Sequence, residues 1–105
     1  MAKFNIKFLP EAYKDLDSIF DYILLESPDN ADNMLDKIMK SIQILEDYPF
    51  SNIIIEHKLL IYYNFGALIV KPYIVFYRVI DKNVFIYRVL HGAMDYVDIL
   101  KIDII

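Results

Sequence analysis

Residues 73–90, which read YIVFYRVI, then DKN, then VFIYRVL, decide the fold of this 105-residue chain. Two runs rich in β-branched and aromatic residues flank three polar residues, and this pattern is typical of two antiparallel strands joined by a short turn. Asn83 tolerates the positive φ that the last residue of a three-residue hairpin turn requires. The sequence therefore predicts a β-hairpin with strands 73–80 and 84–90 and a turn at 81–83.

The register of this hairpin predicts which side chains share a face of the sheet. With a three-residue turn, Ile80 would lie opposite Val84 and Phe76 opposite Arg88. One face would then carry both arginines among apolar side chains, namely Ile74, Phe76, Arg78, Ile80, Val84, Ile86, Arg88 and Leu90. We expect this face to be open, because two arginines are not buried without partners. The opposite face, which runs from Tyr73 to His91 by the same alternation, would lie under the helices.

An exposed apolar face beside two guanidinium groups indicates a binding surface. The candidate partner-binding residues are Ile74, Phe76, Arg78, Ile86, Arg88 and Leu90. The alternative is that residues 53–63 or the C-terminal tail cover this face. A two-residue turn would also shift the register by one and change the cross-strand pairs.

The chain before the hairpin predicts one strand and two helices. Residues 3–9 alternate apolar and polar side chains, whereas residues 10–26 and 28–48 repeat apolar side chains every three or four positions. Two amphipathic helices with so short a connection should form an antiparallel hairpin. Residues 67–70 form a further short strand, and residues 49–64 are compatible with either a strand or an apolar loop. We therefore predict an α+β fold: an N-terminal strand and an antiparallel helical hairpin packed on a curved antiparallel β-sheet.

Composition limits the possible functions. A length of 105 residues and an apolar fraction of 57% predict a single folded domain, residues 1–105. Because cysteine is absent, we expect no disulfides and no thiolate metal sites. The net charge is −4, with ten acids against five lysines in residues 1–52 and five acids against six cations in residues 53–105. This balance has the wrong sign for a protein that wraps nucleic acid, so we do not expect direct nucleic-acid binding. No targeting segment and no apolar run of membrane-spanning length is visible, which favours a cytoplasmic protein and no membrane partner.

Residues that could support catalysis are few. The chain has no zinc-protease, calcium-loop or phosphate-loop motif, and we expect no metal or cofactor. General acid–base cleavage of RNA would need cations to stabilise the developing phosphorane charge. The candidates for such a site are Lys71, Arg78, Arg88, His91 and Tyr96.

Residues 68–96 carry a recognisable pattern: a tyrosine-led strand ending in FYRV, a turn, and RVLHG followed by an acid and a tyrosine. With LPEAYKDLDSIFDYI in the first helix and LEDYP at the end of the second, the chain resembles the ParE/RelE superfamily of type II toxin–antitoxin toxins, also called plasmid stabilisation proteins. The resemblance implies a toxin that forms a hetero-oligomer with a cognate antitoxin, whose extended segment wraps over it. RelE-like members cleave mRNA on the ribosome, whereas ParE-like members inhibit DNA gyrase without nuclease activity.

Departures from the superfamily pattern favour the ParE-like branch. Gly66-Ala67, Ile74 and Met94 stand where ribonuclease members carry basic residues. Since one charge-stabilising group is commonly worth ~10²–10³ in rate, their loss argues against cleavage. We therefore predict a toxin that binds gyrase and is not an enzyme. The alternatives are a RelE-like ribosome-dependent endoribonuclease and an inactive toxin-fold binding module, the latter because Met94 departs from many ParE-like members too.

Overall fold

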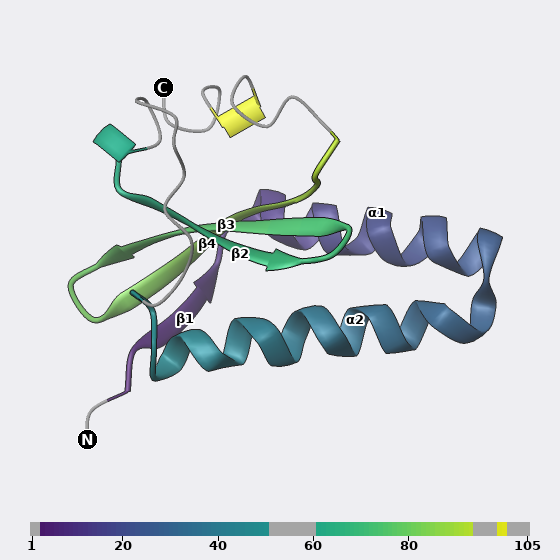
Figure 1. Cartoon of the computed structure of the whole chain (residues 1–105), viewed down its shortest axis with the longest axis horizontal. Coiled ribbons are helices and arrows are strands. Elements are labelled where there is room, and N and C mark those ends of the chain that lie inside the picture. Colours follow the sequence, from purple (N-terminus) through teal and green to yellow (C-terminus); the bar gives the residue numbers. More distant parts are fainter. Residues whose placement is uncertain (1–2, 51–60, 94–98, 101–105) are drawn as a thin grey trace.

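The computed structural model describes residues 3–50, 61–93 and 99–100. Within them the elements follow the order β1 (Asn5–Phe8), α1 (Pro10–Glu26), α2 (Pro28–Gln43), the 3₁₀ turn η1 (Ile44–Glu46), β2 (Phe65–Val70), β3 (Tyr73–Ile80) and β4 (Asn83–His91). The strands form one sheet in the order β1-β4-β3-β2, and α1 and α2 run antiparallel on one side of it (Figure 1). The predicted α+β class, with a helical hairpin packed on a sheet, is confirmed.

Most element boundaries follow the sequence patterns. Strand β3 has the predicted limits, and α1 begins at Pro10 and buries Ala12 and Leu16. Strand β2 begins at Phe65, two residues before its expected start. Strand β1 pairs in parallel with β4, so the sheet is mixed and only the β2–β3 and β3–β4 pairs are antiparallel. None of the described helices is both long and apolar enough to cross a membrane.

The predicted turn of the β3–β4 hairpin is wrong by one residue. Ile80 pairs with Asn83, so the turn consists of Asp81 and Lys82, and Asp81 rather than Asn83 has a positive φ, 57°. Aspartate is one of the few residues that adopt this conformation readily. A bulge then leaves Tyr87 as an extra residue in β4, and beyond it Phe76 pairs with Arg88 as predicted.

Between the turn and the bulge, the shifted register changes the faces of β4, because a slip of one residue turns the side chains of that stretch to the other side. Val84 and Ile86 are fully buried in the core beneath the helices, together with Val75 and Tyr77. The placement of Val84 and Ile86 on the Arg78 face is therefore wrong.

The sheet face that points away from the helices, called the outer face below, is covered in part. A second cluster on this face comprises Phe65, Ala67, Phe76, Leu90 and Leu100. Phe76 and Leu90 are only 1% and 3% exposed, and Leu100, near the end of the chain, packs in the same cluster, with Tyr63 and Ile99 against it. The expectation that these two side chains are exposed is wrong, and the alternative of a C-terminal cover describes them correctly. Ile74 on the same face is half-buried.

A glycine in β2 makes room for the ring that ties the helical hairpin to the sheet. Gly66 lies directly opposite Tyr77, and a Cβ atom at Gly66 would lie within 2.7 Å of the Cε2 and Oη atoms of that ring. The Tyr77 hydroxyl is buried and donates a hydrogen bond of 2.7 Å to the Pro49 carbonyl, just after η1. A side chain at position 66 would force this ring, and the contact that it makes, to move.

We expect Gly66→Ala to lower the free energy of unfolding by about 1–3 kcal/mol, the usual cost of overpacking. The matched control is Gly92→Ala, since a Cβ there would lie 3.5 Å from its nearest neighbour, the Pro72 carbonyl. Urea unfolding of both variants provides the comparison. A Gly66→Ala variant as stable as the wild type would show that the Tyr77 ring is not confined by Gly66.

Candidate functional site

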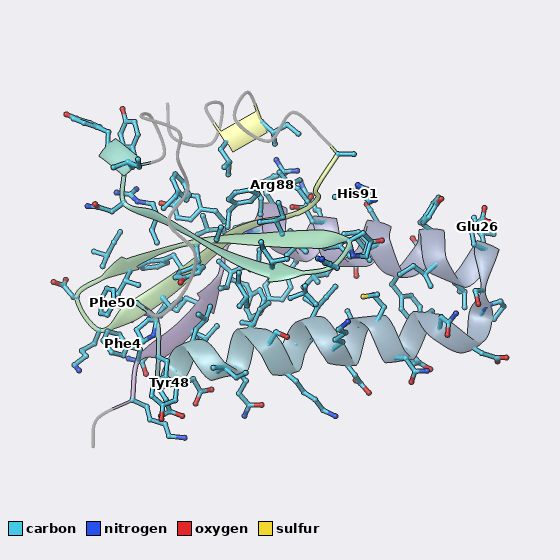
Figure 2. The ribbon with its side chains drawn as sticks, in the orientation of Figure 1. Phe4, Glu26, Tyr48, Phe50, Arg88 and His91 are labelled. Carbon is cyan, nitrogen blue, oxygen red and sulfur yellow. The ribbon has the colours of Figure 1, made fainter. Side chains whose placement is uncertain are left out.

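The chain has two arginines, and the structure places them in different environments. Arg88 belongs to the part of β4 that passes α1, whereas Arg78 projects from β3 on the outer face. Figure 2 shows Arg88 and His91 toward the end of β4 that lies beside α1. Of the candidates for RNA cleavage that the structure describes, Arg78 therefore lies apart from Arg88 and His91.

Arg88 is held by a carboxylate of α1. Its Nε and one terminal nitrogen donate hydrogen bonds of 2.7 and 2.8 Å to the two oxygens of Asp15. The backbone N–H of Val89 donates a third, of 2.9 Å, to the same carboxylate. The side chains of Arg88 and Asp15 are only 17% and 12% exposed. This bidentate geometry is the strongest form of a carboxylate–arginine contact.

The position of Asp15 follows from where β1 ends. Strand β1 pairs with β4 only as far as Phe8 and Ile86, and the Leu9 N–H donates one more hydrogen bond to the Ile86 carbonyl. Beyond that point α1 has begun, so the next part of β4 has no β1 neighbour. Asp15 supplies the acceptor that a strand would have supplied to the Val89 N–H. The carboxylate therefore accepts a backbone hydrogen bond at the edge of the sheet, and it also neutralises Arg88.

Arg78 has no such partner. Its guanidinium carbon lies 6.0, 5.7 and 5.8 Å from the ring centres of Tyr63, Phe65 and Tyr87, and one terminal nitrogen donates a 3.2 Å hydrogen bond to the Tyr87 hydroxyl. Its Nε is buried and, within the described ranges, has no hydrogen-bond partner. Among the described residues no carboxylate forms an ion pair with Arg78. We call Arg78, Tyr63, Phe65 and Tyr87 the Arg78 cluster.

A pocket of about 510 Å³ lies between α1 and the ends of β3 and β4. Arg88 and His91 line it, together with Ser18, Tyr22 and Tyr73. His91 is exposed, and its Nδ1 accepts a 3.1 Å hydrogen bond from the Ala93 N–H. Burial, with a smaller contribution from Tyr22, raises the pKa of Tyr73 above its ordinary value of 10.0, so its hydroxyl is protonated at neutral pH.

The remaining predicted residues are distributed as follows. Lys71 is exposed in the turn before β3, next to Pro72, which lines the pocket. Tyr96 lies outside the described residues. Within residues 3–50, 61–93 and 99–100, no three histidine, aspartate or glutamate side chains converge to hold a metal ion.

Two features of the site were not predicted from the sequence. Asp15 is one of many acids on a helix, and its partner lies 73 residues away, so no local pattern identifies it. Lys7 was also missed. Ile6 and Phe8 pack on the helix-side core, so Lys7 between them points to the outer face, where it pairs in register with Phe85. Since Phe85 in turn pairs with Arg78, the two cations lie in one row across the sheet.

Solved structures share this fold at low sequence identity. The chromosomal ParDE toxin–antitoxin system from P. aeruginosa matches with a TM-score of 0.72 at 20% identity, covering 87% of this chain and 98% of that chain. The toxin–antitoxin complex RelBE2 from Mycobacterium tuberculosis matches with a TM-score of 0.62 at 19% identity, over 85% and 98%. The conserved hypothetical protein HP0894 from Helicobacter pylori matches with a TM-score of 0.52 at 22% identity, over 86% and 96%.

Comparison of the sequence with protein-family models identifies the family, whereas the solved structures show only the fold. A search of curated proteins gives no significant match. The family model described as the ParE toxin of the type II toxin–antitoxin system parDE matches residues 6–96, which is most of the chain and includes both arginines. This confirms the resemblance seen in the strand pair, and the chain belongs to the ParE toxin family.

Proposed function

We propose that this ParE-family protein is a cytoplasmic toxin, that a cognate antitoxin neutralises it, and that it acts by binding DNA gyrase rather than by cleaving RNA. Family membership supports the toxin role. The ParDE and RelBE2 structures that share its fold are described as toxin–antitoxin systems or complexes, which supports an antitoxin partner.

The observation that argues most directly against cleavage is the separation of the two arginines. A ribonuclease must gather cations around one phosphate to stabilise the charge that develops on it. Arg88 is already neutralised by Asp15, and Arg78 belongs to a different cluster. Ile74 and Leu90 face each other across β3 and β4 on the outer face, where a phosphate-binding surface would need polar or basic groups. A binding function needs no such cluster.

The structure narrows the proposed partner surface. Ile86, Phe76 and Leu90 are buried, and Arg88 is occupied by Asp15. Of the six residues predicted for partner binding, Arg78 and the half-buried Ile74 therefore remain as side chains that a partner can reach without prior rearrangement. We propose that these two, with Tyr87 beside them, contribute to the partner surface.

A RelE-like ribonuclease is the second candidate, and one observation favours it. The pocket beside α1 brings His91 and Arg88 together, and Lys71 lies in the adjacent turn. An imidazole near a guanidinium is a feature that general acid–base catalysis could use. The neutralisation of Arg88 makes this the weaker candidate.

One experiment separates these functions. We expect the chain, expressed without antitoxin, to inhibit gyrase supercoiling while mRNA stays intact in a translation-coupled cleavage assay. Co-expression of the cognate antitoxin should restore supercoiling. Cleaved mRNA with normal supercoiling would contradict gyrase inhibition and support the ribonuclease. No effect on supercoiling, mRNA or growth would instead indicate an inactive binding module.

If Arg88 is structural, removing the charge of its partner should destabilise the fold. Asp15→Asn keeps the shape of the side chain but removes the negative charge that faces a largely buried guanidinium, so we expect a loss of about 2–3 kcal/mol in the free energy of unfolding. Asp17→Asn, on the exposed side of the same helix, is the control and should change stability by less than about 0.5 kcal/mol. Equal stability of the two variants in urea unfolding would show that the Asp15–Arg88 contact does not hold the fold.

A further inference from the structure

We propose that Arg78 is a carboxylate-binding residue, and that the carboxylate belongs to an aspartate or glutamate of the antitoxin. This inference rests on the proposed function and names the group that the partner presents at this site. The Arg78 guanidinium is surrounded by the rings of Tyr63, Phe65 and Tyr87, all within 6.0 Å of its central carbon. Rings at this distance restrict the position of the guanidinium before any partner arrives.

Within the described part of the chain, no carboxylate pairs with the charge of Arg78. Its guanidinium donates a hydrogen bond to a neutral hydroxyl, that of Tyr87, and its Nε–H finds no acceptor among the residues that the structure describes. A half-buried guanidinium has lost part of its hydration, and aromatic rings replace only part of the interaction energy. Arg88 shows what the same side chain does when an acid is in reach: it forms a bidentate pair with Asp15. Arg78 therefore has the donors, but not the acceptor, of such a pair.

The row of residues beside Arg78 indicates how an acidic segment would lie. Lys7, Phe85 and Arg78 are successive neighbours across β1, β4 and β3. Two strand spacings separate the backbones of Lys7 and Arg78, roughly 10 Å, which is about three residues of extended chain. Every second side chain of an extended segment points to the same side, so acids two or four residues apart can both face the sheet, at spacings of roughly 7 or 13 Å. An extended segment that crosses the sheet can therefore place one acid at Arg78 and a second one near the exposed Lys7. Between them, Phe85 offers an apolar contact.

A protein carboxylate fits this surface better than nucleic acid does. The row offers two cations, and two phosphate contacts give only a weak, salt-sensitive affinity. The chain as a whole carries a net charge of −4, which opposes the approach of a polyanion. A single carboxylate at a desolvated arginine, in contrast, contributes strongly to a protein–protein contact.

The test compares two variants in complex formation with the purified cognate antitoxin, the product to be sought in a short neighbouring reading frame. Arg78→Gln should raise the dissociation constant on the order of 100-fold, mainly through faster dissociation. Lys71→Gln, which removes an exposed cation from the β2–β3 turn, is the matched control and should change the constant less than about threefold. The free Arg78→Gln toxin should be about as stable as the wild type in urea, because the loss of the ring contacts is offset by the removal of a half-buried charge that has no carboxylate partner in the described part of the chain. Weaker binding with unchanged or greater stability separates recognition from a structural role.

Replacing the antitoxin's acids one at a time by their amides identifies the partner group. One substitution should weaken binding as much as Arg78→Gln does and should have no further effect in the Arg78→Gln background. Two results would overturn the carboxylate assignment while leaving the proposed function intact. One is that the Arg78→Gln toxin binds the antitoxin with wild-type affinity. The other is that the effect of every antitoxin substitution simply adds to that of Arg78→Gln. If a single-stranded oligonucleotide binds and Arg78→Gln abolishes that binding, Arg78 is a phosphate ligand instead. If the wild-type toxin does not bind the antitoxin at all, the proposed function fails and this inference fails with it.

Discussion

The carboxylate of Asp15 is the contact on which the arrangement of this protein depends. It accepts two hydrogen bonds from Arg88 and one from the Val89 backbone, and so it joins α1 to β4 at the point where β1 has ended. A single acid thus completes an open sheet edge, neutralises a largely buried charge and fixes the first helix against the sheet. The pocket that contains His91 lies against this contact, because Asp15 and Arg88 both line it.

The same contact divides the roles of the two arginines. Their strand neighbours read alike, FYRV and IYRV. Arg88 nevertheless pairs with a carboxylate of α1, whereas Arg78 has no carboxylate partner among the described residues. The extra residue in β4 contributes to the difference, because it places Tyr87 on the outer face beside Arg78 while Ile86 stays in the helix-side core. We infer that the fold uses one arginine for stability and leaves the other for a partner.

The sequence predicted the fold well where a pattern repeats within one element. The limits of β3, the start of α1 and the helical hairpin follow from periods of two and of three to four residues. The turn was misplaced because Asp81 and Asn83 both tolerate a positive φ, and one residue of register decided the face of Val84 and Ile86. The contacts that define the site could not be predicted, since Asp15 and Arg88, like Leu100 and Phe76, are far apart in the chain.

The most direct test of this division is a ¹⁵N NMR spectrum of the arginine Nε–H groups, because the chain has only two. In the free toxin, the Arg88 signal should exchange slowly with water and should move in the Asp15→Asn variant, since its proton is bonded to a carboxylate. On addition of the antitoxin, the Arg78 signal should shift and the Arg88 signal should stay in place. A spectrum in which the antitoxin shifts Arg88 and leaves Arg78 unchanged would contradict the account.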